Sequence, residues 1–109
     1  MVRGAPQAVG LSLVYRVVFR PQAEDEVLEV RQWYEARRAG LGREFGEAVD
    51  GLVARVAANP LAFERVHQET RRAVLTRFPY AIYFRVSGDD IVVQAVHGRQ
   101  HPSRWQRRV

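Results

Sequence analysis

The pattern of apolar and polar positions predicts one strand, then two helices, then three further strands. In Val14–Arg20, an apolar face of Tyr15, Val17 and Phe19 alternates with a mixed face of Val14, Arg16, Val18 and Arg20, which is typical of a strand with one buried and one partly wet face. Pro21–Arg38 and Leu41–Asn59 carry apolar residues every three or four positions, which indicates two amphipathic helices. Only a few residues around Gly40 separate the two segments. We therefore expect an antiparallel helical hairpin.

Each predicted helix has one apolar stripe that is expected to pack on a sheet. The stripes consist of Ala23, Val27, Val30 and Tyr34 in the first helix, with Trp33 at its edge, and of Leu41, Phe45, Val49, Leu52 and Val56 in the second.

The segment from Arg71 to Trp105 contains three short apolar runs and is predicted to form most of the sheet. Phe78-Pro79 and Ser87–Asp90 separate the runs, as expected for an antiparallel meander. Tyr80–Val86 alternates, with Tyr80, Ile82, Phe84 and Val86 on the core face. Ile91–His97 is apolar on both faces, which favours a central position in the sheet.

Two segments of this half are less clear from the pattern. In Arg71–Arg77 either Val74 or Leu75 can define the buried face. Leu61–Thr70 has no strand pattern and is predicted to be a connecting loop, with Phe63 as a candidate anchor.

The predicted order is β-α-α-β-β-β, an α+β fold in which an antiparallel αα-hairpin packs on a small, mainly antiparallel sheet. Residues 14–109 form a single domain, which a chain of 109 residues is long enough to stabilise through its own core. Residues 1–13 lack periodicity and are expected to be a loose extension. A helical turn is expected near Pro102-Ser103.

Composition and charge narrow the candidate functions. The chain has no cysteine and no long apolar run, so a disulfide framework, a thiolate metal site and a membrane span are not expected, and the cytoplasm is the expected compartment. The net charge is +5, and residues 61–109 carry nine arginines against four acidic residues. All 17 basic residues are arginine, which a G+C-rich coding bias explains more simply than a need for forked phosphate or carboxylate recognition does. The sheet half is expected to face an acidic partner.

Four segments, in order and at matching spacing, resemble the RelE/ParE superfamily of type II toxin–antitoxin toxins, and within it the ParE-like, plasmid-stabilisation branch. They are YRVVFRPQAEDEV, WYEARRAGLGREF, ANPLAF, and RRAVLTRFPYAIYFRV followed by VVQAVHGRQHPSRW. The resemblance covers about residues 14–105. It implies a small toxin of β-α-α-β-β-β fold that arrests growth when free and is neutralised by a cognate antitoxin.

The ParE-like resemblance implies a protein-binding inhibitor of DNA gyrase that performs no chemistry. Arginines of the sheet and tail are the candidate target contacts, because guanidinium groups form forked hydrogen bonds with acidic groups. They are Arg71, Arg72, Arg77, Arg99, Arg104, Arg107 and Arg108. The alternative for each of them is simple solvation of an open face.

An amphipathic antitoxin segment is predicted to lie over the helical hairpin and adjoining sheet, either as a helix in a groove or as an added strand. The predicted contacts are Trp33, Tyr34, Leu41 and Phe45, which surround the helix joint. The alternative, that all four fill the core, applies to Phe45 at least as strongly as to the others.

The RelE-like resemblance implies instead a ribosome-dependent endonuclease that cleaves mRNA without a metal. Such cleavage needs a general base, a general acid and cations around the phosphate. The candidates are Arg77, Tyr83, His97, Arg99 and His101. Against it, the lysine cluster of many RelE-like nucleases has no counterpart in a chain without lysine, and SRWQRR offers no match to their C-terminal catalytic residue.

Two further interpretations are weaker. His97 and His101 are four residues apart but lie in a Gly/Pro turn without a carboxylate pair, so no metal or other cofactor is expected. Solvated imidazoles are expected, with His97 either hydrogen-bonded at the end of the sheet or lining a functional surface. A basic nucleic-acid-binding module rests on charge alone, since no recognition motif is present.

Overall fold

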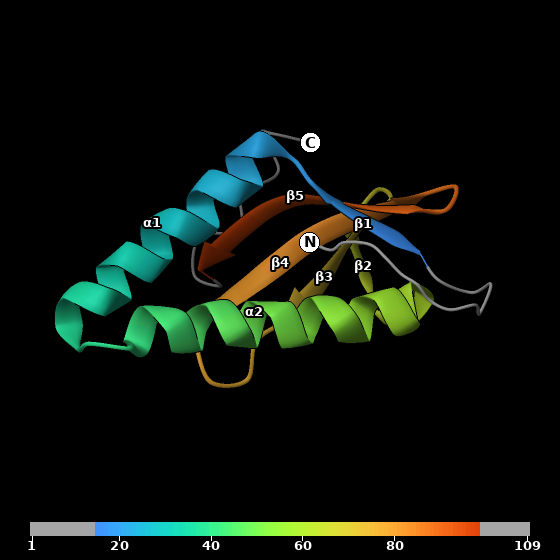
Figure 1. Cartoon of the computed structure of the whole chain (residues 1–109). Coiled ribbons are helices and arrows are strands. Elements are labelled where there is room, and N and C mark those ends of the chain that lie inside the picture. Colours follow the sequence, from blue (N-terminus) through green and yellow to red (C-terminus); the bar gives the residue numbers. More distant parts are fainter. Residues whose placement is uncertain (1–14, 99–109) are drawn as a thin grey trace.

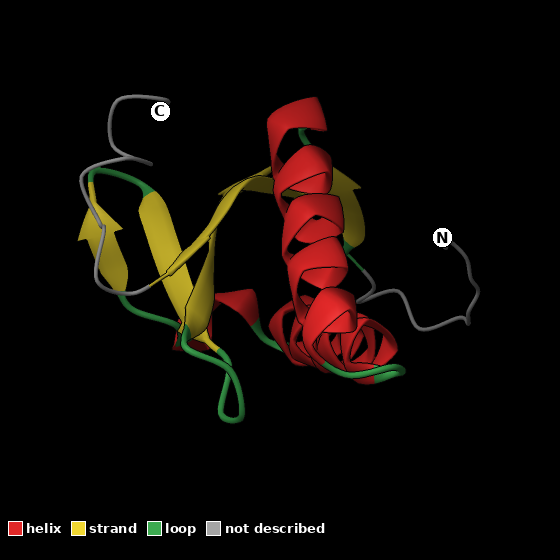
Figure 2. Cartoon of the chain, turned by 90° about the vertical axis from the view of Figure 1, so that its left-hand side faces the viewer, coloured by secondary structure: helices red, strands yellow, loops and turns green. Residues whose placement is uncertain are grey.

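A computed structural model describes residues 15–98, in which two helices lie on one face of a five-stranded sheet (Figures 1 and 2). The predicted extension over residues 1–13 and the predicted turn near Pro102 lie outside the described residues. The elements are β1 (Arg16–Phe19), α1 (Pro21–Arg37), α2 (Leu41–Ala58), a 3₁₀ turn (Pro60–Ala62), β2 (Arg65–His67), β3 (Thr70–Val74), β4 (Tyr80–Ser87) and β5 (Asp90–Gly98).

The sheet has the strand order β1-β5-β4-β3-β2. β1 pairs with β5 in parallel, and the other neighbouring strands are antiparallel. The predicted α+β fold, with a helical hairpin on a mainly antiparallel sheet, is confirmed. The central position predicted for Ile91–His97 is also correct, because β5 lies between β1 and β4.

The segment Leu61–Thr70, predicted to be a loop, contains the end of the 3₁₀ turn, the short edge strand β2 and the first residue of β3. The guanidinium of Arg71 donates to the carbonyl oxygen of Phe63 at 2.6 Å, and the backbone N–H of Arg72 donates to the carbonyl oxygen of Glu64 at 3.1 Å. β2 has three residues, too few for an alternating pattern to reveal it.

The predicted helix stripes form the main core against one face of the sheet. Ala23, Phe45, Val49, Leu52 and Val56 are buried, and the other stripe residues pack against them. The sheet contributes Ala73, Leu75, Ile82, Phe84, Ile91, Val93 and Val96 to the same cluster. Leu75 rather than Val74 therefore faces the main core, which resolves the ambiguity in this segment.

β4 is buried on both faces, whereas the sequence indicated one core face. Ala81 and Tyr83 form a second buried cluster with Ala95 on the face opposite to the helices. The pairing register shifts between Tyr83, which lies opposite Ala95, and Phe84, which lies opposite Val93. This irregularity leaves Gln94 as an extra residue in β5, and its side chain accepts a buried hydrogen bond from Thr70 at 2.9 Å.

The helices diverge from their joint as the two arms of a V in front of the sheet (Figure 1). Near the joint the arms touch at Gly42, where an added Cβ atom would lie 2.5 Å from the carbonyl oxygen of Arg31. A backbone oxygen cannot swing away as a flexible side chain can. Glycine at this position therefore allows the close approach of the helices.

We predict that Gly42→Ala destabilises the fold by about 1–3 kcal/mol, because the new methyl group forces the helices apart. Gly51→Ala is the matched control, since it lies in the same helix with nothing within 4 Å of an added Cβ atom. That change should stabilise by about 0.5–1 kcal/mol. Urea denaturation measures both, and equal effects would show that the contact at Gly42 is unimportant.

Candidate functional site

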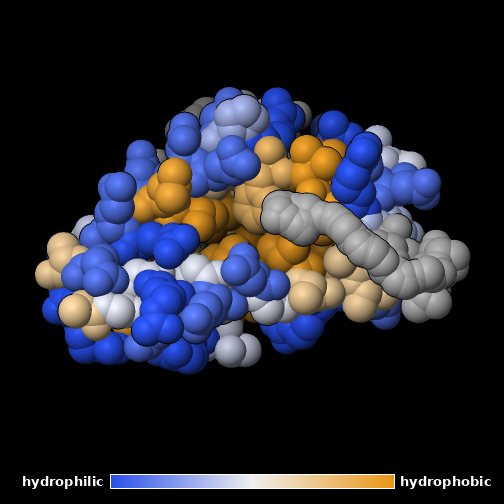
Figure 3. Space-filling model, viewed as in Figure 1, coloured by the Kyte–Doolittle hydropathy of each residue, from blue (hydrophilic) through white to orange (hydrophobic). Residues whose placement is uncertain are grey.

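A hollow of about 330 Å³ lies between the arms of the V and the end of β1. Hydrophobic side chains gather there between the two polar helix surfaces (Figure 3). Its apolar lining comes from Phe19 at the end of β1, Val27 and Leu28 on α1, and Val49 on α2. Leu28 is 52% exposed, so this surface is open to a partner.

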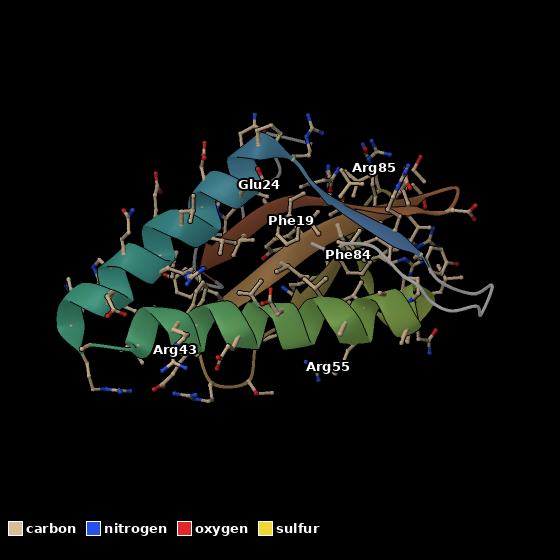
Figure 4. The ribbon with its side chains drawn as sticks, viewed as in Figure 1. Phe19, Glu24, Arg43, Arg55, Phe84 and Arg85 are labelled. Carbon is tan, nitrogen blue, oxygen red and sulfur yellow. The ribbon has the colours of Figure 1, made fainter. Side chains whose placement is uncertain are left out.

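Charged residues border the hollow. Glu24 and Arg31 come from α1, and Asp50 comes from α2 (Figure 4 labels Glu24 and Phe19). Gly46 completes the lining, and an added Cβ atom there would lie 3.2 Å from Cζ of Arg31. The missing side chain at Gly46 thus provides the space in which the Arg31 guanidinium lies against α2.

This hollow is not among the sites predicted from the sequence. Leu28 lies outside the apolar stripe of α1, and Gly42 and Gly46 are four residues apart on α2. Two signals in the sequence could have indicated the site. The isolated apolar residue indicates an exposed apolar surface, and the two glycines on one helix face indicate a close contact between helices.

The Glu35 side chain fixes the joint between the helices. Its carboxylate accepts hydrogen bonds from the backbone N–H groups of Gly40 at 2.9 Å and Gly42 at 3.0 Å, which are unpaired donors at the start of α2. These two bonds lower the pKa of Glu35. Gly40 has a φ of +89°, which glycine adopts without strain.

Aromatic rings fill the space beneath the joint. Phe45 is fully buried, with ring centroids 5.2 Å from Phe78 and 5.5 Å from Tyr34. The prediction that Phe45 contacts an antitoxin directly does not hold in this structure, because it has no exposed surface. Tyr34 and Leu41 are half-buried against the core. Trp33 is 51% exposed, and the Arg37 guanidinium lies 3.6 Å from its ring centroid.

The structure does not bring the predicted sheet arginines together into one patch. Arg71 binds the carbonyl oxygen of Phe63, and Arg72 forms a 2.8 Å ion pair with Glu64. Successive strand residues point to opposite faces, so these two side chains diverge. Arg77 follows β3 and forms a 2.8 Å ion pair with Glu44 on α2. Arg99, Arg104, Arg107 and Arg108 lie outside the described residues.

Arg85 is a candidate contact outside the set of arginines predicted from the sequence. It lies on β4 and shares the sheet face opposite to the helices with Tyr83. Its side chain is half-buried and forms no salt bridge within residues 15–98. Figure 4 labels this side chain beside the sheet. By contrast, the two arginines of the adjacent strand β3 contact groups within the protein. Arg71 binds the Phe63 carbonyl oxygen, and Arg72 pairs with Glu64.

Two of the candidate nuclease groups, Tyr83 and His97, are enclosed. Tyr83 has no exposed surface, and His97 is 4% exposed. The expectation of a solvated imidazole at His97 is wrong because the side chain is buried. Its Nε2 atom instead lies 3.5 Å from Oε2 of Glu26, a polar contact at the end of the sheet. The other oxygen of Glu26 accepts a 2.8 Å hydrogen bond from the Val96 N–H, where β1 has ended and no longer pairs with β5. Arg99 and His101 fall outside the range that the structure describes.

Within residues 15–98, no three acidic or histidine side chains are placed to hold a metal ion. Neither helix has an apolar stretch of the length needed to cross a bilayer.

Comparison with known families gives a match over residues 17–102 to the model of the ParE toxin of the type II toxin–antitoxin system parDE. The matched segment includes all of both helices and four of the five strands completely, and most of β1. No curated protein matches the sequence.

The fold is similar to those of solved toxin–antitoxin proteins. A chain of the chromosomal ParDE system from P. aeruginosa superposes with a TM-score of 0.63 at 17% identity, covering 80% of this chain and 98% of that chain. A chain of the toxin–antitoxin complex RelBE2 from Mycobacterium tuberculosis gives a TM-score of 0.57 at 16% identity, covering 79% and 99%.

The Glu35 contact predicts a pH-dependent stability. Because its pKa is lower in the folded state, the stabilisation is complete above the pKa of the unfolded carboxyl group and is lost as the pH falls through the folded value. Glu35→Gln should therefore be less stable than the wild type near pH 7, and the difference should shrink below about pH 4. Denaturation of both proteins across this range measures it. A difference that is constant with pH would contradict the role of the charge.

Proposed function

Since this chain belongs to the family of ParE toxins of type II toxin–antitoxin systems, we propose that it arrests growth by inhibiting DNA gyrase and that a cognate antitoxin neutralises it. The observation that carries the proposal is the family match over residues 17–102, which spans the helical hairpin and nearly the whole sheet. The likeness to a chain of a ParDE system supports the same fold.

The burial of the candidate acid–base groups supports inhibition by binding rather than RNA cleavage. A general acid or base must come within hydrogen-bond distance of the reacting oxygen. Tyr83 and His97 would need a rearrangement of the sheet to do so. The chain also contains no lysine to stabilise phosphate charge. The RelE-like alternative, in which the chain cleaves mRNA on the ribosome, retains the support of its fold similarity to RelBE2. Either target places the protein in the cytoplasm.

We assign target binding to the sheet face opposite to the helices and antitoxin binding to the helical hairpin. On the sheet face, Arg85 is the arginine whose guanidinium forms no salt bridge with the described residues, which makes it the candidate donor to an acidic target. On the hairpin, half-exposed Trp33 and the apolar hollow offer the kind of surface that binds an amphipathic segment. A target and an antitoxin thus meet different sides of the same domain.

A supercoiling assay with purified gyrase tests this function. The isolated protein should reduce supercoiling of relaxed plasmid or accumulate cleaved plasmid, and the antitoxin should reverse the effect. Failure at a large excess of the protein would remove gyrase as the target. Cleavage of a defined mRNA on ribosomes by the same sample would then establish the alternative.

Within that assay, Arg85→Ala should weaken inhibition by about fivefold or more, because it removes a charged donor from the proposed contact. Arg55→Ala is the matched control, since Arg55 is exposed on α2 and forms no salt bridge with the described residues (Figure 4). Equal inhibition by both variants would place the target contact elsewhere.

A further inference from the structure

We propose that the hollow between α1 and α2 selects an antitoxin segment that carries one basic side chain among apolar residues, with Glu24 and Asp50 as the residues that determine this specificity. The inference rests on the proposed toxin–antitoxin function and adds the chemistry of the bound segment. The lining combines four apolar side chains with two carboxylates and one guanidinium.

The charge of this hollow is opposite to that of the protein. The chain has a net charge of +5, whereas the lining groups Glu24, Asp50 and Arg31 together carry a formal charge of −1. One lysine or arginine from a partner would balance the lining. A partner with an acidic residue at that position would leave three carboxylates around one guanidinium, and close like charges disfavour binding.

The two carboxylates are available for such a contact. Neither Glu24 nor Asp50 forms a salt bridge within the described part of the chain, and Arg31 lies within ion-pair distance of neither. Both residues are exposed. A partner that covers the apolar lining of the hollow would remove water from their surroundings, and a cationic group between them would then compensate for the lost hydration.

The stability of the helices does not account for both residues. Glu24 lies in the first turn of α1, where a negative charge favours the helix dipole. Asp50 has no such role, because it lies in the middle of α2, where aspartate is a poor helix former. Its neighbours four residues away are Gly46 and Ala54, so no ion pair along the helix is available to it.

The apolar lining of the hollow, which we call the apolar floor, determines which residues of the antitoxin segment flank its basic side chain. Phe19, Val27, Leu28 and Val49 present hydrophobic surface from three elements, and Leu28 is half-exposed in the free protein. A segment that places apolar residues on this floor and its basic residue toward the carboxylates satisfies both parts of the site. A uniformly polar or acidic segment satisfies neither.

Calorimetric titration of the full-length toxin with the protein encoded by the neighbouring gene tests the inference. The double variant Glu24→Gln, Asp50→Asn should bind at least about tenfold more weakly than the wild type, with a smaller dependence of affinity on salt. The double variant Glu29→Gln, Glu47→Gln is the control, because it also removes one carboxylate from each helix but neither residue lines the hollow. It should bind as the wild type does. Thermal unfolding of each variant verifies folding.

The outcomes separate the inference from the function on which it rests. In one outcome, the protein encoded by the neighbouring gene neutralises the wild-type toxin, and the Glu24→Gln, Asp50→Asn variant binds it with unchanged affinity and salt dependence. This result would overturn the inference and leave the toxin–antitoxin function intact. A wild-type toxin that fails to bind this product at micromolar concentrations would overturn the proposed function itself. A concentration-dependent dimer that the same double variant dissociates would identify a second copy as the occupant and also overturn the inference.

Discussion

The contact between α1 and α2 at their joint is the constraint on which the rest of the structure depends. Gly42 lets the backbone of α2 approach the Arg31 carbonyl group, and the Glu35 carboxylate holds the first N–H groups of α2. Because the helices meet at this end, they diverge toward the other, where β1 completes a hollow instead of a closed core (Figures 1 and 3). The open apolar surface of this small domain is therefore a consequence of a local hydrogen-bonding arrangement.

The three described arginines that the sequence assigned to a partner make contacts within the fold instead. Arg71 satisfies a loop carbonyl group, Arg72 is paired with Glu64, and Arg77 connects the loop after β3 to Glu44 on α2. Glu44 also binds Arg38, and the hydrogen bonds from Arg77 and Arg38 lower its pKa. The charge excess of the C-terminal half thus overstates how much positive charge the sheet offers to a target. Arg85 is the exception among the strand residues discussed.

Local periodicity was sufficient to predict the helices and the central strand, because burial of Phe45, Leu52 or Val93 requires only that each element has an apolar face. It could not predict β2, which has three residues, or the second buried face at Tyr83, since tyrosine suits both faces of a strand. It also could not predict the hollow. Phe19, Leu28 and Asp50 come from three elements, and only their arrangement in space makes them neighbours.

The division of the domain into an antitoxin-binding hairpin and a target-binding sheet face is the central claim, and side-chain footprinting by hydroxyl radicals tests it most directly. In the free chain the exposed fractions are 52% for Leu28, 51% for Trp33 and 61% for Leu61, so the radicals can reach all three, and each residue is compared with its own labelling rate in the free protein. On addition of the antitoxin, Leu28 and Trp33 should become protected while Leu61, in the 3₁₀ turn, remains reactive. Unchanged reactivity of Leu28 and Trp33 in a neutralised complex would contradict the account.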